Sequence, residues 1–302
     1  MTPYSLSTSW NSKSHKNGYD IVKEAREAGF DTVELGFSLT ETVVSDVLAL
    51  KEAGEIKVSS LHNMCPLPPE IDPLGASPDQ YSLASPDAEE RALAVRIAKN
   101  TIDYAKKFEA RAVVLHAGRV QVKDRMRELA LLAGDKERLD SLRQDMINER
   151  RSNMSGCLDD LMKSLDELAD YAVKMGIPIG IENRYHYREM PLIDEFEVIF
   201  KNFKPGRLYY WHDVGHAEVF ERLGFYAHRE LLEKFSGRLI GIHLHDIIGS
   251  IDDHRPPGRG TFDFKLIKPY MREDLIKVLE VHQPAGADDI RKGVEYLNKI
   301  LK

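Results

Sequence analysis

The sequence predicts an α/β protein built as a single (β/α)8 TIM barrel, and three observations support this fold. Short β-branched or apolar runs alternate with segments of helical periodicity, which is typical of βαβ units around a parallel sheet. About eight such runs occur in the 302 residues. No linker rich in Pro, Gly or Ser divides them, and barrels of about 250 residues or more commonly form one unit. We therefore expect residues 1–302 to form one domain.

The predicted strands are short runs in which β-branched and apolar residues dominate. In chain order they are Tyr4–Trp10, Thr32–Phe37, Lys57–Met64, Ala112–His116, Ile177–Glu182, Leu208–Asp213, Leu239–His245 and Leu275–His282. Between them, apolar residues recur at three- and four-residue intervals, which predicts helices. These helices are Gly18–Ala28, Glu41–Ala53, Asp87–Phe108, Cys157–Met175, Ile193–Phe203, Ala227–Phe235 and Asp288–Leu301. A doubly wound sheet would need a glycine-rich phosphate turn after the first strand, where the chain instead reads Ser-Thr-Ser-Trp-Asn.

One segment, Val120–Met154, falls outside this repeat, between the fourth strand and its expected helix. It is rich in Arg, Glu, Asp and Leu. Its charge density and leucine spacing predict an insertion of one or two amphipathic helices that project above the barrel mouth. We interpret it as a solvated charged excursion, and a lid or a subunit contact is the alternative.

The composition excludes several classes of protein. Apolar residues make up 42% and charged residues 30% of the chain, which excludes a disordered or fibrous protein. With 42 basic and 49 acidic side chains the net charge is −7, so nucleic acid is a disfavoured partner, although a local basic patch stays open. No window approaches about 18 uninterrupted apolar residues, and the N-terminal segment lacks the apolar stretch of a signal peptide. We therefore expect a cytoplasmic protein that does not bind a membrane.

The two cysteines restrict the kind of metal site that the chain can build. Cys65 and Cys157 lie far apart and in no Cys-x-x-Cys pattern. This argues against a disulfide framework and against a thiolate zinc site. Any bound metal must therefore use oxygen and imidazole ligands.

Acids and imidazoles gather at the carboxyl ends of six predicted strands, where barrels of this class build their active sites. These residues are His62, His116, Glu182, Asp213 with His216, His245 with Asp246, and Glu280. A buried ionised carboxylate without a partner costs several kcal/mol, so such a set needs mutual pairing or a cation. A mixture of carboxylate and imidazole suits a divalent ion such as Mn²⁺, Zn²⁺, Mg²⁺ or Co²⁺.

At these residues the chain resembles the xylose isomerase-like TIM barrels, a superfamily of sugar isomerases and epimerases that also includes endonuclease IV. The resemblance covers most of the chain outside the insertion. In the ketohexose 3-epimerase branch one metal ion is held by four strand-end residues. Their counterparts in this sequence are Glu182 (in IEN), Asp213 (in DVGH), His245 (in HLH) and Glu280 (in LEV). The resemblance also implies that Glu182 and Glu280 are the paired catalytic acid and base, and that His216 orients the substrate.

This assignment is chemically consistent. Removing a proton next to a carbonyl develops an enediolate, whose negative charge a divalent ion stabilises. One carboxylate takes the proton and a second returns it. We therefore expect an isomerase or epimerase of sugar metabolism that acts on a sugar, a sugar acid or a sugar phosphate through a metal-bound enediolate.

Two further stretches supply candidate substrate contacts. The loop after the seventh strand, residues 252–260, resembles a Pro-Gly-x-Gly loop of the superfamily, which makes His254 and Arg255 candidate anchors for substrate oxygens. Arg188 stands where the epimerase pattern has a glutamate, and a cation there favours a substrate with a carboxylate or phosphate. An anion pocket built with the neighbouring basic residues is an open interpretation, with solvated loop arginines as the alternative. The other basic residues are Arg119, Arg184 and His186.

A zinc-dependent AP endonuclease of the endonuclease IV type is the alternative function. The resemblance supplies counterparts for all of its metal ligands, namely His62, His116, Glu182, Asp213, His216, His245, Asp252, His254 and Glu280. The spacing from His245 to Asp252 is short for a third metal, and a net charge of −7 offers no obvious field for DNA. A sugar-binding barrel without catalysis is a third hypothesis. Related barrels often associate, so we also expect a homo-oligomer such as a dimer or tetramer.

Overall fold

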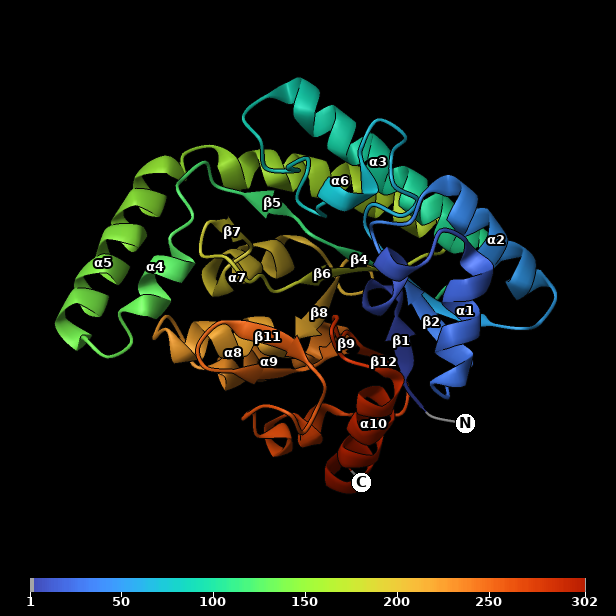
Figure 1. The fold of residues 1–302 in the computed structure, drawn as a ribbon. Coiled ribbons are helices and arrows are strands. Elements are labelled where there is room, and N and C mark those ends of the chain that lie inside the picture. Colours follow the sequence, from blue (N-terminus) through green and yellow to red (C-terminus); the bar gives the residue numbers. More distant parts are fainter. Residues whose placement is uncertain (1–2, 302) are drawn as a thin grey trace.

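The computed structural model describes residues 3–301, and within them eight parallel strands close into a barrel (Figure 1). The order around the barrel is β1, β12, β9, β8, β6, β4, β3 and β2. Their bounds are β1 Ser5–Ser7, β2 Thr32–Leu35, β3 Lys57–His62, β4 Ala112–Leu115, β6 Ile179–Glu182, β8 Tyr209–Asp213, β9 Leu239–Leu244 and β12 Ile276–Leu279. Every one of them lies inside a run predicted from the sequence. The predicted (β/α)8 barrel is therefore confirmed.

The predicted helices also form, with small shifts at their ends. Their bounds are α1 Gly18–Glu27, α2 Glu41–Glu52, α3 Ala88–Lys107, α6 Cys157–Met175, α7 Ile193–Asn202, α9 His228–Phe235 and α10 Ala287–Leu301. The prediction missed α8, Val214–Arg222, which starts directly after β8. The side chain of Asp213 accepts the backbone N–H of His216 and caps this helix, so one residue ends the strand and starts the helix.

The first predicted strand is too long. Its last three residues, Thr8–Trp10, form a 3-10 turn instead of extended chain. The Ser7 hydroxyl accepts the backbone N–H of Ser9 at 3.4 Å and caps this turn. A local side chain to backbone hydrogen bond therefore outweighs the β-branched pattern here.

The insertion folds into α4, Met126–Leu131, and α5, Lys136–Asn153, which lie beside β5 and β7 at one side of the barrel (Figure 1). The helix prediction is confirmed. Most side chains of the insertion are at least partly exposed, as a solvated charged excursion requires, but one face of α5 is buried. Arg150 on α5 is buried, with Nη1 at 2.5 Å from Glu195 Oε1 of α7. Its Nη2 donates to the Glu189 carbonyl at 3.1 Å. This buried contact fixes α5 to the loop after β6.

Two short antiparallel sheets extend the loops at the carboxyl ends of the strands. One pairs β5, Gly118–Arg119, with β7, Glu189–Met190. The other pairs β10, Asp246–Ile248, with β11, Asp252–Arg255. Because β5 follows β4, β7 follows β6 and both β10 and β11 follow β9, these sheets stand at the mouth of the barrel.

A small apolar cluster fills the barrel below the mouth, built from Ala112, Val114, Trp211, Ile276 and Val278. Trp211 fits only because Gly241 has no side chain, since a Cβ there would lie 2.1 Å from the indole. The barrel is thus a packed support for the residues above it. Within residues 3–301, none of the helices has the length and hydropathy needed to cross a bilayer.

Candidate active site

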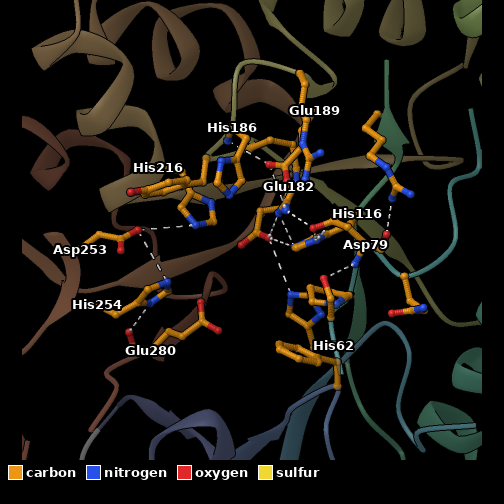
Figure 2. A pocket seen from close by; sticks show the side chains of 18 of the residues that line it. His62, Asp79, His116, Glu182, His186, Glu189, His216, Asp253, His254 and Glu280 are labelled. Atoms are coloured by element: carbon orange, nitrogen blue, oxygen red, sulfur yellow. Dashed lines mark hydrogen bonds and ion pairs between the residues drawn. The ribbon is translucent and has the colours of Figure 1, made fainter. Parts of the chain in front are cut away.

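A cavity of about 540 Å³ opens at the carboxyl ends of the strands. It is lined by residues of many separate loops and strand ends, among them His62, His116, Glu182, His216, His254 and Glu280 (Figure 2). Its volume is in the range of pockets that bind small molecules. Of the residues predicted for the site, Arg188 also lines this cavity.

Four residues at the base of the cavity form what we call the central group: Glu182, Asp213, His243 and Glu280. Each offers one ligand atom, and these atoms all lie within 4.8 Å of one another. His243 Nδ1 lies 2.5 Å from Glu182 Oε1 and 3.0 Å from Glu280 Oε2. All four side chains are buried. Three carboxylates and one imidazole are a donor set that a divalent ion such as Mn²⁺ or Zn²⁺ accepts.

Glu34 of β2 fixes the orientation of the His243 ring. Its Oε1 lies 3.0 Å from His243 Nε2, and its Oε2 accepts the Ser60 hydroxyl at 2.7 Å. A carboxylate on the outer nitrogen of a histidine is the usual support of a metal ligand, because it turns the other nitrogen toward the ion. Burial alone would lower the pKa of His243, but the charges around it, that of Glu280 foremost, raise it well above the ordinary value. The surrounding carboxylates therefore stabilise a positive charge at the position of the His243 ring.

His245, the residue predicted as the imidazole ligand, lies outside the central group and belongs to another set of possible ligands, with His254 and Glu280. Its Nδ1 accepts the backbone N–H of His254 at 2.9 Å, so its ring proton is on Nε2. Nε2 lies 2.9 Å from Asp213 Oδ2, which makes His245 a hydrogen-bond donor that orients this carboxylate. His243 lies on β9 and His245 follows the end of this strand, two residues further on, so the sequence pattern HLH, with its two-residue spacing, does not distinguish them.

Glu182 connects the central group to a second set of residues, because its two oxygens point to different partners. Oε1 faces His243, whereas Oε2 lies 2.6 Å from His116 Nε2 and 3.7 Å from His62 Nε2. His62, His116 and Glu182 form a three-ligand set that we call the β3–β4 group. Burial would raise the pKa of Glu182, but the charge of His243 and hydrogen bonds from the histidines hold it well below the ordinary value. The carboxyl is therefore ionised.

A guanidinium lies in the β3–β4 group. Arg184 Nη1 contacts His116 Nε2 and lies 3.1 Å from Glu182 Oε2. Its Nη2 donates to Asp79 at 2.8 Å and lies 3.3 Å from Glu189. No sequence pattern indicates Asp79, because this residue lies in the long loop before α3 and belongs to no strand end.

On the opposite side of the cavity, His216, Asp253 and His254 form a third set, the β8–β11 group (Figure 2). Asp253 Oδ2 lies 3.8 Å from His216 Nε2 and 3.7 Å from His254 Nε2. This oxygen is buried and has no hydrogen-bond partner among the described residues. Asp253 lines the cavity, and this oxygen is a buried acceptor left without a donor within residues 3–301.

Two predicted site residues, Asp252 and Arg255, belong neither to the lining of the cavity nor to any ligand group among the described residues. Asp252 and Arg255 pair with each other at 2.6 Å, with both side chains at least one-third exposed. The predicted Asp-x-His ligand pair, Asp252 with His254, is replaced by the adjacent residues Asp253 and His254. His254 has a φ of +53°, which breaks the side-chain alternation of the strand and turns neighbouring residues to the same side. Arg255, predicted as a substrate anchor, is absent from the residues that line the cavity.

Asp246, another strand-end acid, organises the loop that follows. Its Oδ2 accepts the backbone N–H groups of Gly258 and Gly260, both at 2.9 Å, and its Oδ1 accepts that of Phe262 at 3.0 Å. A Cβ at Gly260 would lie 2.3 Å from the carboxylate, so only glycine permits this close approach. The lone pairs of Asp246 are thus used by the backbone.

Comparison with known proteins places the chain in a family. Residues 22–300 match the family model AP endonuclease 2, described as xylose isomerase-like TIM barrel. The chain belongs to this family. It is 25% identical to the uncharacterized protein MJ1614 of Methanocaldococcus jannaschii, over 98% of each chain.

Two solved structures share the fold. A D-tagatose 3-epimerase-like protein superposes with a TM-score of 0.72 at 21% identity, over 100% of this chain and 97% of that one. The IOLI protein, solved with a bound zinc atom, superposes with a TM-score of 0.65 at 13% identity, over 100% of this chain and 98% of that one. At these identities the likeness establishes the fold alone.

Proposed function

We propose that the protein is a divalent-metal-dependent isomerase or epimerase of a sugar or sugar derivative. The observation that carries this proposal is the pair of buried carboxylates, Glu182 and Glu280, whose oxygens both lie within 3.0 Å of His243 Nδ1 at the base of a cavity. Two carboxylates that can serve as base and acid therefore lie beside a set of ligand atoms spaced closely enough to bind one metal ion. The fold shared with an epimerase-like protein supports the same reaction class.

The residues present fit a resident metal ion. Glu182, Asp213, His243 and Glu280 would hold it, with Glu34 and His245 orienting two of these ligands. The donor set suits Mn²⁺, Zn²⁺, Mg²⁺ or Co²⁺. Such an ion, when bound, supplies Lewis-acid stabilisation of the negative charge that develops on the substrate oxygens.

Glu182 and Glu280 carry the proton transfer. One removes the proton next to the substrate carbonyl and the other delivers a proton to the enediolate. Burial would raise the pKa of Glu280, but the charge of His243 holds it below the ordinary value, so the carboxyl is ionised in the resting site. His216 and His254 face the same cavity and would orient the substrate hydroxyl groups.

Arg188 and Arg119 indicate that the substrate carries an acidic group. Both line the cavity, and the backbone of Arg188 is held by the N–H of Val120 at 2.8 Å. The Nε of Arg188 is buried and has no hydrogen-bond partner among residues 3–301. A guanidinium with unused donors suits a carboxylate or phosphate. We therefore favour a sugar acid or sugar phosphate over a free sugar.

Exchange of substrate protons with solvent tests the reaction class. Ketoses, sugar acids and sugar phosphates would be incubated with the metal-loaded enzyme in D₂O, and deuterium at the carbon next to the carbonyl would be followed by NMR. We expect exchange with the wild type and a loss of about 100-fold to 10,000-fold in Glu280→Gln, which keeps the shape of the side chain but removes the base.

Glu273→Gln, an exposed change near the same strand, is the control and should exchange at the wild-type rate. Undiminished exchange in Glu280→Gln would remove this residue from the mechanism. A wild type that exchanges none of these compounds would count against the reaction class as a whole.

A zinc-dependent AP endonuclease is the second candidate, and a specific observation favours it. The β3–β4 group and the β8–β11 group flank the central group, and each offers three ligand atoms within 4.8 Å of one another. Three zinc ions per chain together with cleavage of DNA at abasic sites would establish this function in place of the first.

A further inference from the structure

Both histidines of the β3–β4 group are held in the orientation of metal ligands. His62 Nδ1 lies 2.7 Å from the Asn63 carbonyl oxygen, so this nitrogen carries the ring proton and Nε2 points into the group. His116 Nδ1 lies 3.2 Å from both oxygens of Asp79, which likewise directs Nε2 into the group. An acceptor on the outer nitrogen, with the inner nitrogen turned toward a shared carboxylate, is the arrangement found at metal-bound histidines, and here both inner nitrogens face Glu182.

Arg184 lies where such an ion would bind. Its Nη1 contacts His116 Nε2 and lies 3.1 Å from Glu182 Oε2, two of the three atoms that would be ligands. Metal ligands approach an ion to about 2.0–2.2 Å, so an ion and this guanidinium cannot share the space. The arginine is 4% exposed and its guanidinium stays protonated under all ordinary conditions.

The charges around Arg184 are those that a cation requires. Three carboxylates surround the guanidinium, those of Asp79, Glu182 and Glu189, at 2.8, 3.1 and 3.3 Å. Each would be costly to bury without a positive partner. The chain therefore supplies from its own sequence the positive charge that a second metal ion would otherwise supply.

We propose that Arg184 is a built-in cation that takes the place of a second metal ion in the β3–β4 group and leaves the central group as the metal site on this side of the cavity. It acts as a positioning residue, because it holds Glu182 Oε2 while Oε1 stays directed at the central group. The inference rests on the proposed function where it assumes a metal ion in the central group. The prediction for the β3–β4 group does not depend on the proposed function.

Metal counting in Arg184 variants tests this directly. Metal-free protein would be loaded with Co²⁺, freed of unbound metal and analysed for cobalt per chain, and anomalous diffraction would locate each ion. In Arg184→Met, which keeps the length of the side chain and removes its charge, we expect one ion more than in the wild type, between His62, His116 and Glu182. Arg184→Lys keeps the charge and should show the wild-type count.

A variant that relieves the excess negative charge covers the case in which Arg184→Met does not fold. In Arg184→Met/Asp79→Asn one carboxylate is removed with the arginine, and the new amide oxygen can still accept the His116 Nδ1 proton. This double variant should also gain one ion in the β3–β4 group.

Two results would overturn the inference. One is a soluble charge-removing variant with the same ion count as the wild type, which would leave Arg184 as a structural ion pair alone. The other is a wild type that already holds an ion between His62 and His116. A wild type without an ion in the central group, combined with a variant that gains one in the β3–β4 group, would overturn the proposed function and support this inference.

Discussion

Two histidine-containing groups face each other across the cavity, and they differ in how their carboxylates are neutralised (Figure 2). In the β3–β4 group Glu182 pairs with the guanidinium of Arg184. In the β8–β11 group Asp253 has an oxygen without a hydrogen-bond partner among the described residues, and the nearest imidazole nitrogens are 3.7 and 3.8 Å away.

The comparison shows that the kinds of ligand do not by themselves decide where an ion or substrate binds. Both groups combine two histidines with one carboxylate. The β3–β4 group is satisfied within the chain, whereas the β8–β11 group is open to a hydroxyl or a cation from the cavity. We therefore propose that the first group positions Glu182 and that the second binds the substrate.

The largest expected effect comes from a buried arginine that lacks histidine neighbours. Arg150→Met leaves Glu195 buried without its partner at 2.5 Å, and we expect the free energy of unfolding to fall by about 3–5 kcal/mol, as measured by urea denaturation. The cobalt count should stay at the wild-type value, because Glu195 belongs to none of the ligand groups within residues 3–301.

The matched control is Arg125→Met, which breaks the more exposed pair with Glu128 and should lower the free energy of unfolding far less than Arg150→Met does. An extra ion in Arg150→Met would show that loss of any buried guanidinium lets the protein bind metal nonspecifically. An extra ion in Arg184→Met would then no longer indicate that Arg184 takes the place of a metal ion.

A smaller effect is expected on the open side of the cavity. Asp253→Asn removes the charge of the unpaired oxygen, and a hydrogen bond to a charged group contributes about 1.5–3 kcal/mol, so KM should rise by roughly 10-fold to 100-fold. Steady-state kinetics on the substrate identified by proton exchange would measure it.

The neighbouring change Asp252→Asn is the control, because this carboxylate is exposed and pairs with Arg255. Equal KM values for the two variants would contradict the assignment of the β8–β11 group to substrate binding.

The smallest effect concerns the cavity rim, where His186 Nδ1 lies 2.9 Å from Asp124 of the insertion. Burial would lower the pKa of His186, but its interaction with Asp124 raises it above the ordinary value. A raised pKa in the folded state adds stability below the unfolded pKa of about 6.5, and this stability is lost as the pH rises through the folded pKa.

Thermal unfolding across pH would measure this contribution. His186→Asn should destabilise the protein near pH 5–6 by less than about 1 kcal/mol, since both side chains are about one-third exposed, and should have no effect at alkaline pH. A larger loss at high pH than at low pH would contradict this interpretation of the pair.

The fold could be predicted because the alternation of strands and helices follows from local patterns of apolar residues. Each barrel strand lies within a predicted run, and the errors occur where a side chain bonds the backbone. Ser7 caps a turn inside the first predicted strand, and Asp213 starts a helix directly after a strand. Both contacts depend on the local backbone geometry, which the spacing of apolar residues along the sequence does not reveal.

The candidate site was predictable in part. Glu182, Asp213 and Glu280 lie together in the structure because the carboxyl ends of β6, β8 and β12 meet at the same mouth of the barrel. The choice between His243 and His245 was not predictable, because residues two apart share one face and only the partners on their second nitrogens separate them.

The pairing of Arg184 with Asp79 was not predictable either. The two residues are 105 positions apart, and Asp79 lies in a loop without a strand-end signal. Contacts of this kind depend on how loops fold over the barrel mouth, which a pattern of local periodicity does not describe.

Anomalous diffraction from crystals of the wild type loaded with Mn²⁺ or Co²⁺ tests the central claim most directly. We predict one strong peak among Glu182, Asp213, His243 and Glu280, with none between His62 and His116. A crystal with no peak in the central group, or with an ion in each of the three groups, would contradict the single-metal isomerase or epimerase proposed for this chain.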